Sequence, residues 1–92
     1  MSFLFQLVSK AVDNFDQSTQ DLILIEEMSE LIKELLKRRR GAKNDDHIKE
    51  ELTHVLISLY VVKTILGITD EDIEDEAKKK LEKYGWNTII KE

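Results

Sequence analysis

Two pairs of ionisable side chains are spaced so that each pair would share one face of a helix. Glu27 and Glu30 are three residues apart, and Glu51 and His54 repeat that spacing further along the chain. Residues three apart project on the same side of an α-helix. Three carboxylates and one imidazole crowded at the edge of a core are unfavourable without a cation, because desolvated carboxylates lose hydration without gaining a partner. The pattern therefore predicts a divalent metal site.

The types of donor atom restrict the metal. The chain has no cysteine, so a thiolate site is excluded. Carboxylate oxygens suit Mg²⁺ or Mn²⁺, and the imidazole of His54 shifts the preference toward Mn²⁺ or another transition ion. Three more acids lie within a turn of the two pairs, and we interpret them as supporting residues or extra ligands: Glu26, Glu34 and Glu50.

The first pair lies on a predicted helix over about residues 19–40. Its apolar stripe repeats at helical spacing, with Leu24, Met28, Leu31 and Leu35 as its centre. The cations Lys37 to Arg40 are placed where the helix dipole is negative, and Gly41 follows in a position typical of a C-terminal cap. These two signals predict the same helix end.

The second pair lies on another predicted helix, which begins after an N-cap at Asn44 or Asp45 and stops at Gly67. Its stripe has the same period, with members Ile48, Leu52, Val55, Leu59, Val62 and Leu66. If the two stripes pack antiparallel across the short connection, the two pairs of ionisable residues come face to face.

Two further helices complete the prediction. One runs from Phe3 to about Asn14, and the other from about Asp70 to Tyr84, starting at a capping box in which Thr69 is followed by Asp72. We therefore expect an all-α fold, an antiparallel bundle of about four helices forming a single domain over residues 1–92. So short a chain exposes more apolar stripe than its own helices can cover, and we expect a homodimer or homotetramer.

Composition excludes several other classes of protein. Without cysteine there is no disulfide scaffold, which fits a reducing compartment. A net charge of -5 argues against a nonspecific nucleic-acid binder. The apolar runs are too short to cross a membrane, and the apolar N-terminus lacks the features of a secretory signal. We expect a cytoplasmic protein with neither a membrane nor a nucleic acid as its partner.

The sequence around both pairs resembles one family. Residues 26–31, then Arg40-Gly41, then residues 50–57 are similar to the ExxE and ExxD helices of the MazG-like all-α nucleotide pyrophosphohydrolases. The resemblance is close from about Gln20 to Gly67 and holds only in outline for the flanking helices. It implies a compact, single-domain member of that family.

The resemblance also implies a reaction. Glu27, Glu30 and Glu51 would be the catalytic residues that hold Mg²⁺, which neutralises a nucleoside triphosphate and activates water. Hydrolysis between the α and β phosphorus then gives a nucleoside monophosphate and pyrophosphate. The family also uses its last helix on the substrate, and the candidates here are Lys79, Lys83 and Tyr84.

His54 departs from the pattern, because it occupies the position of the family's Asp. A neutral imidazole can bind a cation, but it removes one negative charge and one hard oxygen. Three hypotheses therefore stay open: a metal-dependent nucleoside triphosphate pyrophosphohydrolase, an inactive helical interaction module with the same fold, and a plain structural dimer. Binding of a divalent cation separates the first from the others.

Overall fold

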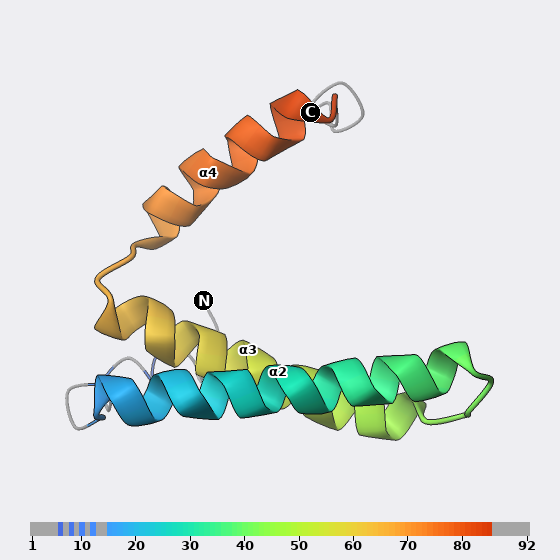
Figure 1. The fold of residues 1–92 in the computed structure, drawn as a ribbon. Coiled ribbons are helices and arrows are strands. Elements are labelled where there is room, and N and C mark those ends of the chain that lie inside the picture. The colour runs from blue at the N-terminus through green and yellow to red at the C-terminus, as the bar shows by residue number, and fades with distance from the viewer. Residues whose placement is uncertain (1–5, 7, 9, 11, 13–14, 86–92) are drawn as a thin grey trace.

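The regular structure of the described residues is helical. The computed structural model describes residues 15–85 together with residues 6, 8, 10 and 12. Within this part of the chain the order is α2 (Gln17–Arg39), α3 (Asp45–Ile65) and α4 (Asp70–Lys83), shown in Figure 1. The predicted all-α class is thus confirmed. The predicted first helix lies mostly outside the described residues, although Gln6, Val8 and Lys10 are helical.

Local chemistry fixes both ends of α2. The Asp16 carboxylate accepts hydrogen bonds from the Thr19 amide at 2.9 Å and the Thr19 hydroxyl at 2.8 Å, which makes Asp16 the N-cap. The same two hydrogen bonds lower the pKa of Asp16. At the other end Gly41 has φ +100°, a conformation that side chains with a Cβ rarely adopt. The predicted end of this helix is confirmed.

The connection between α2 and α3 is held by side chains. Asn44 occupies the N-cap position of α3 but makes no capping hydrogen bond. Its Nδ2 donates instead to the Glu34 carbonyl oxygen at 2.9 Å and to Glu34 Oε1 at 3.2 Å. Lys37 forms an ion pair with Glu34 at 2.9 Å, and Arg38 bonds to Asp45. The turn is therefore fastened to the last turns of α2, where the sequence predicts only a cap.

The Lys37 ammonium and the Asn44 amide together lower the pKa of Glu34, whereas burial acts in the opposite direction. Hydrogen bonds to the charged form of a carboxyl stabilise that form. Glu34 is thus an ionised and almost fully buried residue, with an exposed fraction of 8%.

α2 and α3 lie side by side and run antiparallel (Figure 1). Their contact follows a narrow seam, in which positions of low exposure are spaced three or four residues apart, as in a coiled coil. On α2 the seam residues are Gln20, Leu24, Glu27, Leu31 and Glu34, and on α3 they are Ile48, Glu51, Val55, Ser58 and Val61. The helices therefore bury only part of the predicted apolar stripes.

A second apolar face of the helix pair stays exposed. Its members include Ile25 at 60% exposed, Ile32 at 55% and Leu36 at 49% on α2, with Leu52 and Leu56 exposed on α3. Exposed apolar residues that follow one another along a helix face are usually covered by a partner. As expected from the sequence, α2 and α3 cover only part of their own apolar stripes.

α4 points away from the helix pair. Its axis makes an angle of 111° with α3, and it packs on neither of the other described helices (Figure 1). The predicted capping box is present, with Thr69 N to Asp72 at 2.9 Å and Asp72 N to Thr69 at 3.0 Å. The start of α4 is also tied to α3 by an ion pair between Lys63 and Asp70 at 3.0 Å. The four-helix bundle stays a prediction, because among the described residues α2 and α3 form a pair and α4 points away from it.

Among the described residues, no single helix has the length and apolar character needed to cross a membrane. Only α3 and α4 taken together, across their bend, reach that length and composition.

Candidate metal centre

Three side chains with metal-ligating atoms meet across the seam between α2 and α3. Glu27 comes from α2, and Glu51 and His54 come from α3. His54 Nδ1 lies 3.2 Å from Oε2 of Glu27 and 3.7 Å from Oε2 of Glu51. One donor atom from each residue lies within 4.8 Å of the other two. The predicted meeting of residues from the two helices therefore occurs for three of the four.

The seam explains why these side chains converge. Glu27 and Glu51 occupy positions where a coiled-coil pattern favours leucine, next to Leu31 and Val55. Their side chains are 27% and 20% exposed, while that of His54 is 44% exposed. Partial burial strengthens the repulsion between two carboxylates. A protonated imidazole or a metal cation offsets that repulsion.

The donor set fits a divalent cation. Two donors that each lie about 2.1 Å from one ion are at most about 4.2 Å apart. The three donor atoms here lie within 4.8 Å of one another, so a side-chain shift of well under 1 Å closes the group on an ion. Two carboxylates suit Mg²⁺ or Mn²⁺, and the imidazole shifts the preference toward Mn²⁺ and other ions that accept nitrogen.

Glu30 does not join this group, because its side chain is exposed on the flank of α2. Its backbone is nevertheless close to the centre. Since Glu27 contacts His54 across the antiparallel seam, moving three residues forward on α2 corresponds to moving three residues back on α3. Glu30 is thus about level with Glu51 along the helix pair, although its side chain is not part of the group.

The three acids expected to support the site lie in different surroundings. Glu26 and Glu50 are exposed, on α2 and α3 respectively. Glu34 is held in the turn by Lys37 and Asn44, about two helical turns from Glu27. A shallow hollow of about 350 Å³ opens beside His54 and contains Glu50; its other lining residues are Asp46, Lys49 and Thr53.

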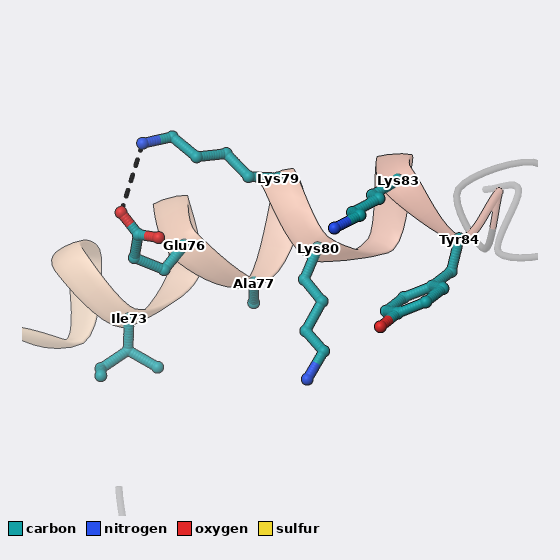
Figure 2. Close-up of a pocket in the computed structure, with 7 residues that line it drawn as sticks. All are labelled: Ile73, Glu76, Ala77, Lys79, Lys80, Lys83 and Tyr84. Atoms are coloured by element: carbon teal, nitrogen blue, oxygen red, sulfur yellow. Dashed lines mark hydrogen bonds and ion pairs between the residues drawn. The ribbon is translucent and has the colours of Figure 1, made fainter.

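The candidates for substrate binding are all on α4. Figure 2 shows Lys79, Lys83 and Tyr84 with other residues that line an open hollow of about 580 Å³ on this helix. Lys79 forms an ion pair with Glu76 at 3.2 Å. Because α4 packs on neither α2 nor α3, these residues are not brought to the metal group of their own chain.

The family assignment follows from a comparison with protein-family models. The model described as the MazG-like family matches residues 21–89, which include the metal group and all of α4. The chain belongs to the MazG-like family. No curated protein and no solved structure matches it. MazG-like proteins are generally associated with nucleotide pyrophosphohydrolase activity. The likeness inferred from the two short motifs therefore extends over most of the chain.

The sequence does not predict the two hydrogen bonds that Asn44 donates to Glu34. A signal for it does exist, because Glu34 follows Glu27 by seven residues and so repeats its place on the helix face. The spacing of the seam could have identified it as a buried carboxylate. The identity of its partners could not be inferred, since Asn44 is expected to cap α3 rather than to bond back to α2.

Proposed function

We propose that this MazG-like chain hydrolyses ribo- or deoxynucleoside triphosphates in a metal-dependent reaction that yields a nucleoside monophosphate and pyrophosphate. The observation that supports the proposal best is the group formed by Glu27, Glu51 and His54. It occupies the two motifs that resemble the metal-binding helices of the family, and the family model covers both motifs. The proposed cofactor is Mg²⁺ or Mn²⁺.

In this proposal each residue of the centre has a role. Glu27, Glu51 and His54 hold the ion, and Glu30 turns inward beside Glu51 as a fourth ligand. When bound, the ion supplies positive charge to the phosphates and lowers the pKa of water. Glu50 lies in the hollow beside His54 and is placed to accept a proton from the attacking water. Lys49 lines the same hollow and offers a cation to a phosphate oxygen.

One observation favours a second candidate function, a helical interaction module without activity. His54 Nδ1 is within 3.2 Å of Glu27, so a protonated imidazole can neutralise the acids without any metal. The histidine also stands where the family has an Asp. In that case the fold serves only to present helix faces to a partner.

We also propose that the chain works as a homodimer or homotetramer. The exposed face of the helix pair, with Ile25, Ile32 and Leu36, is too apolar to remain in water without cost. A second copy carries the same face and can cover it.

The proposal is tested by release of pyrophosphate from a panel of ribo- and deoxynucleoside triphosphates, each with Mg²⁺ or Mn²⁺. The proteins to compare are wild type, Glu27→Gln, His54→Asp and the control Glu82→Gln, whose carboxylate is exposed on α4. We expect wild type and the control to be active, and Glu27→Gln to lose at least about a hundredfold in rate, because one ligand to the ion is weakened.

Three results contradict the proposal. If wild type is silent with both ions while His54→Asp is active, the natural chain is the inactive module. If all four proteins are silent, the enzyme hypothesis fails and only the helical fold remains. Activity in Glu27→Gln equal to that of wild type shows that hydrolysis does not use this group.

A further inference from the structure

The imidazole of His54 presents one particular nitrogen to the two carboxylates of the metal group. Its Nδ1 lies 3.2 Å from Oε2 of Glu27 and 3.7 Å from Oε2 of Glu51, so both carboxylates meet the same ring atom. The two nitrogens of an imidazole are distinct, and their lone pairs point in different directions from the ring. Nδ1 is therefore the nitrogen placed to share a cation with Glu27 and Glu51.

The backbone keeps this nitrogen beside the carboxylates. His54 follows Glu51 by three residues on α3, so the two side chains project on the same side of that helix. Glu27 reaches the same point from α2. Since one donor atom from each residue lies within 4.8 Å of the other two, an ion bound to both carboxylates is also within reach of the imidazole. A ligand set that contains both carboxylates thus contains a nitrogen.

The neighbouring acids do not replace this nitrogen by an oxygen. Glu30, the proposed fourth ligand, adds an oxygen to the set and leaves Nδ1 of His54 in its place. Glu34 is engaged in the turn between α2 and α3, where its carboxylate binds Lys37 and Asn44. The mixed character of the donor set, oxygen with one nitrogen, therefore depends on His54.

A nitrogen among the donors separates two classes of divalent ion. Mg²⁺ and Ca²⁺ are hard cations that take oxygen ligands, and Mg²⁺ also demands near-ideal octahedral geometry. Ions from Mn²⁺ to Zn²⁺ accept imidazole readily, and their affinity for nitrogen donors exceeds that of the hard ions. An imidazole in place of a carboxylate removes a negative charge that Mg²⁺ needs and supplies a donor that a transition ion prefers.

Partial burial of the carboxylates acts in the same direction. The side chains of Glu27 and Glu51 are 27% and 20% exposed, so the seam covers most of both. Mg²⁺ loses water reluctantly and usually keeps several water ligands when it binds to a protein. A seam that covers the carboxylates restricts the water that a bound ion can keep, which is a larger cost for Mg²⁺ than for a transition ion.

We propose that the centre selects a divalent transition ion, from Mn²⁺ to Zn²⁺, against Mg²⁺ and Ca²⁺, and that His54 sets this selectivity through Nδ1. The inference names the class of ion for the site of the proposed function and rests on that site, but it does not require hydrolysis. His47, the other histidine of the chain, lies near Glu34 at 3.9 Å and supplies a matched control.

The test measures binding of Mn²⁺ alone, without nucleotide. Electron paramagnetic resonance gives the amount of free Mn²⁺, and Mg²⁺ or Ca²⁺ is added as the competitor. Electron spin echo envelope modulation of the bound ion shows whether a nitrogen coordinates it. The full-length proteins are wild type, His54→Asp, His54→Asn and the control His47→Asn. His54→Asn adds no charge, so it separates loss of the imidazole from a new carboxylate, and circular dichroism shows that the helices are retained.

We expect wild type to bind Mn²⁺ with nitrogen modulation, and about a hundredfold excess of Mg²⁺ or Ca²⁺ to displace less than half of it. The modulation should disappear in both variants of His54 and persist in His47→Asn. In His54→Asp the ratio of the Mg²⁺ to the Mn²⁺ dissociation constant should fall at least about tenfold, because an all-oxygen set suits Mg²⁺.

Two outcomes overturn this inference and leave the proposed hydrolysis untouched. One is Mn²⁺ bound to wild type without nitrogen modulation, and the other is a selectivity that is the same in wild type and His54→Asp. Absence of Mn²⁺ binding by wild type overturns both proposals. Nitrogen-coordinated, selectively bound Mn²⁺ in a protein that releases no pyrophosphate supports the inference and contradicts the proposed hydrolysis.

Discussion

At the scale of single residues, Glu27 and Glu51 place charge where the seam between two helices favours apolar side chains. Among the described residues, neither carboxylate forms an ion pair with a lysine or arginine, and the imidazole of His54 lies close to both. Charged groups in such positions reduce stability unless a cation or proton balances them. A bound divalent cation would supply that balance for Glu27 and Glu51.

The first prediction concerns metal and stability. A ligand that binds the folded state raises its stability by about 2.7 kcal/mol at 100 times its dissociation constant. We expect Mn²⁺ to raise the melting temperature of wild type and of Glu82→Gln, and to have little effect on Glu27→Gln. Without metal, Glu27→Gln should melt at or above the temperature of wild type, because a repulsion has been removed. Differential scanning calorimetry measures both effects, and an equal metal response in all three proteins would refute this assignment.

The sequence predicts the convergence of Glu27, Glu51 and His54 because helix periodicity fixes the direction of each side chain relative to its stripe. The sequence gives Glu30 the same place beside its apolar stripe as these three residues, so it predicts that all four converge. The structure distinguishes Glu30, which is exposed, because the seam uses a 3.5-residue repeat and includes Glu27 but not its neighbour three residues on. Which of the two glutamates faces the seam depends on how the two helices pack, and the apolar pattern of a single helix does not give that information.

At the scale of elements, the turn between α2 and α3 aligns the two halves of the metal centre. Asn44 and Lys37 hold the Glu34 carboxylate, and Asn44 also bonds to the α2 backbone. Because the helices are antiparallel, a fixed turn fixes their register. The register in turn brings Glu27 opposite His54.

The second prediction is a pH dependence that arises from this turn. The pKa of Glu34 is lowered from its ordinary value of 4.5, mainly by Lys37 and then by Asn44. A carboxyl whose pKa is lower in the folded state contributes stability above its unfolded pKa, and this contribution is lost as the pH falls through the folded pKa. Wild type should therefore be more stable than Glu34→Gln at pH 7, and the difference should shrink as the pH falls below 4.5.

Urea unfolding of the two proteins over this pH range measures the difference. Glu82→Gln serves as the control and should give a difference near zero at pH 7. A gap between wild type and Glu34→Gln that is constant or widens toward low pH would contradict the role given to Lys37 and Asn44.

The third prediction concerns the start of α4. Thr69 and Asp72 form a capping box, and replacing a Thr cap by Ala costs about 1 kcal/mol of helix stability. In Thr69→Ala we expect faster amide hydrogen exchange throughout α4 and unchanged exchange in α2 and α3. Thr53→Ala, which removes a hydroxyl bonded only to a carbonyl of its own helix, is the matched control. Equal exchange of α4 in both variants would show that the box does not hold this helix.

The predicted start of α4 at Thr69 and the predicted end of α2 before Gly41 follow from local signals. The start of α2 lies two residues before the predicted Thr19, because Asp16 caps it. The direction of α4 could not be predicted in this way. It depends on the backbone at Gly67 and on the Lys63 to Asp70 ion pair, neither of which follows from apolar spacing. The sequence therefore predicts the elements and the α2–α3 pair, but not their complete assembly.

At the scale of the whole molecule, the described residues bury few apolar side chains. The three buried apolar residues among those described are valines, Val12, Val55 and Val61, whereas many larger apolar side chains are exposed. So small a core stabilises a fold weakly. Association is the simplest way in which this chain gains the missing apolar contacts.

The fourth prediction tests this association directly. Ile32 is 55% exposed, and changing an exposed residue in a monomer alters stability by less than about 0.5 kcal/mol. If a second copy covers Ile32, Ile32→Ser loses apolar burial at two symmetric positions, and the dissociation constant should rise at least about tenfold. Its melting temperature should also depend more steeply on protein concentration. Lys33→Ser is the control, and identical mass and melting for both variants would contradict the prediction.

The identity of the products tests most directly whether the chain hydrolyses nucleoside triphosphates between the α and β phosphorus. Phosphorus NMR follows a deoxynucleoside triphosphate incubated with the wild-type chain and Mn²⁺ or Mg²⁺, with Glu27→Gln in parallel. We expect that wild type forms a nucleoside monophosphate and pyrophosphate in equal amounts, only with metal, and that Glu27→Gln forms neither at a comparable rate. A nucleoside diphosphate with inorganic phosphate, or an unchanged substrate with both ions, would contradict it.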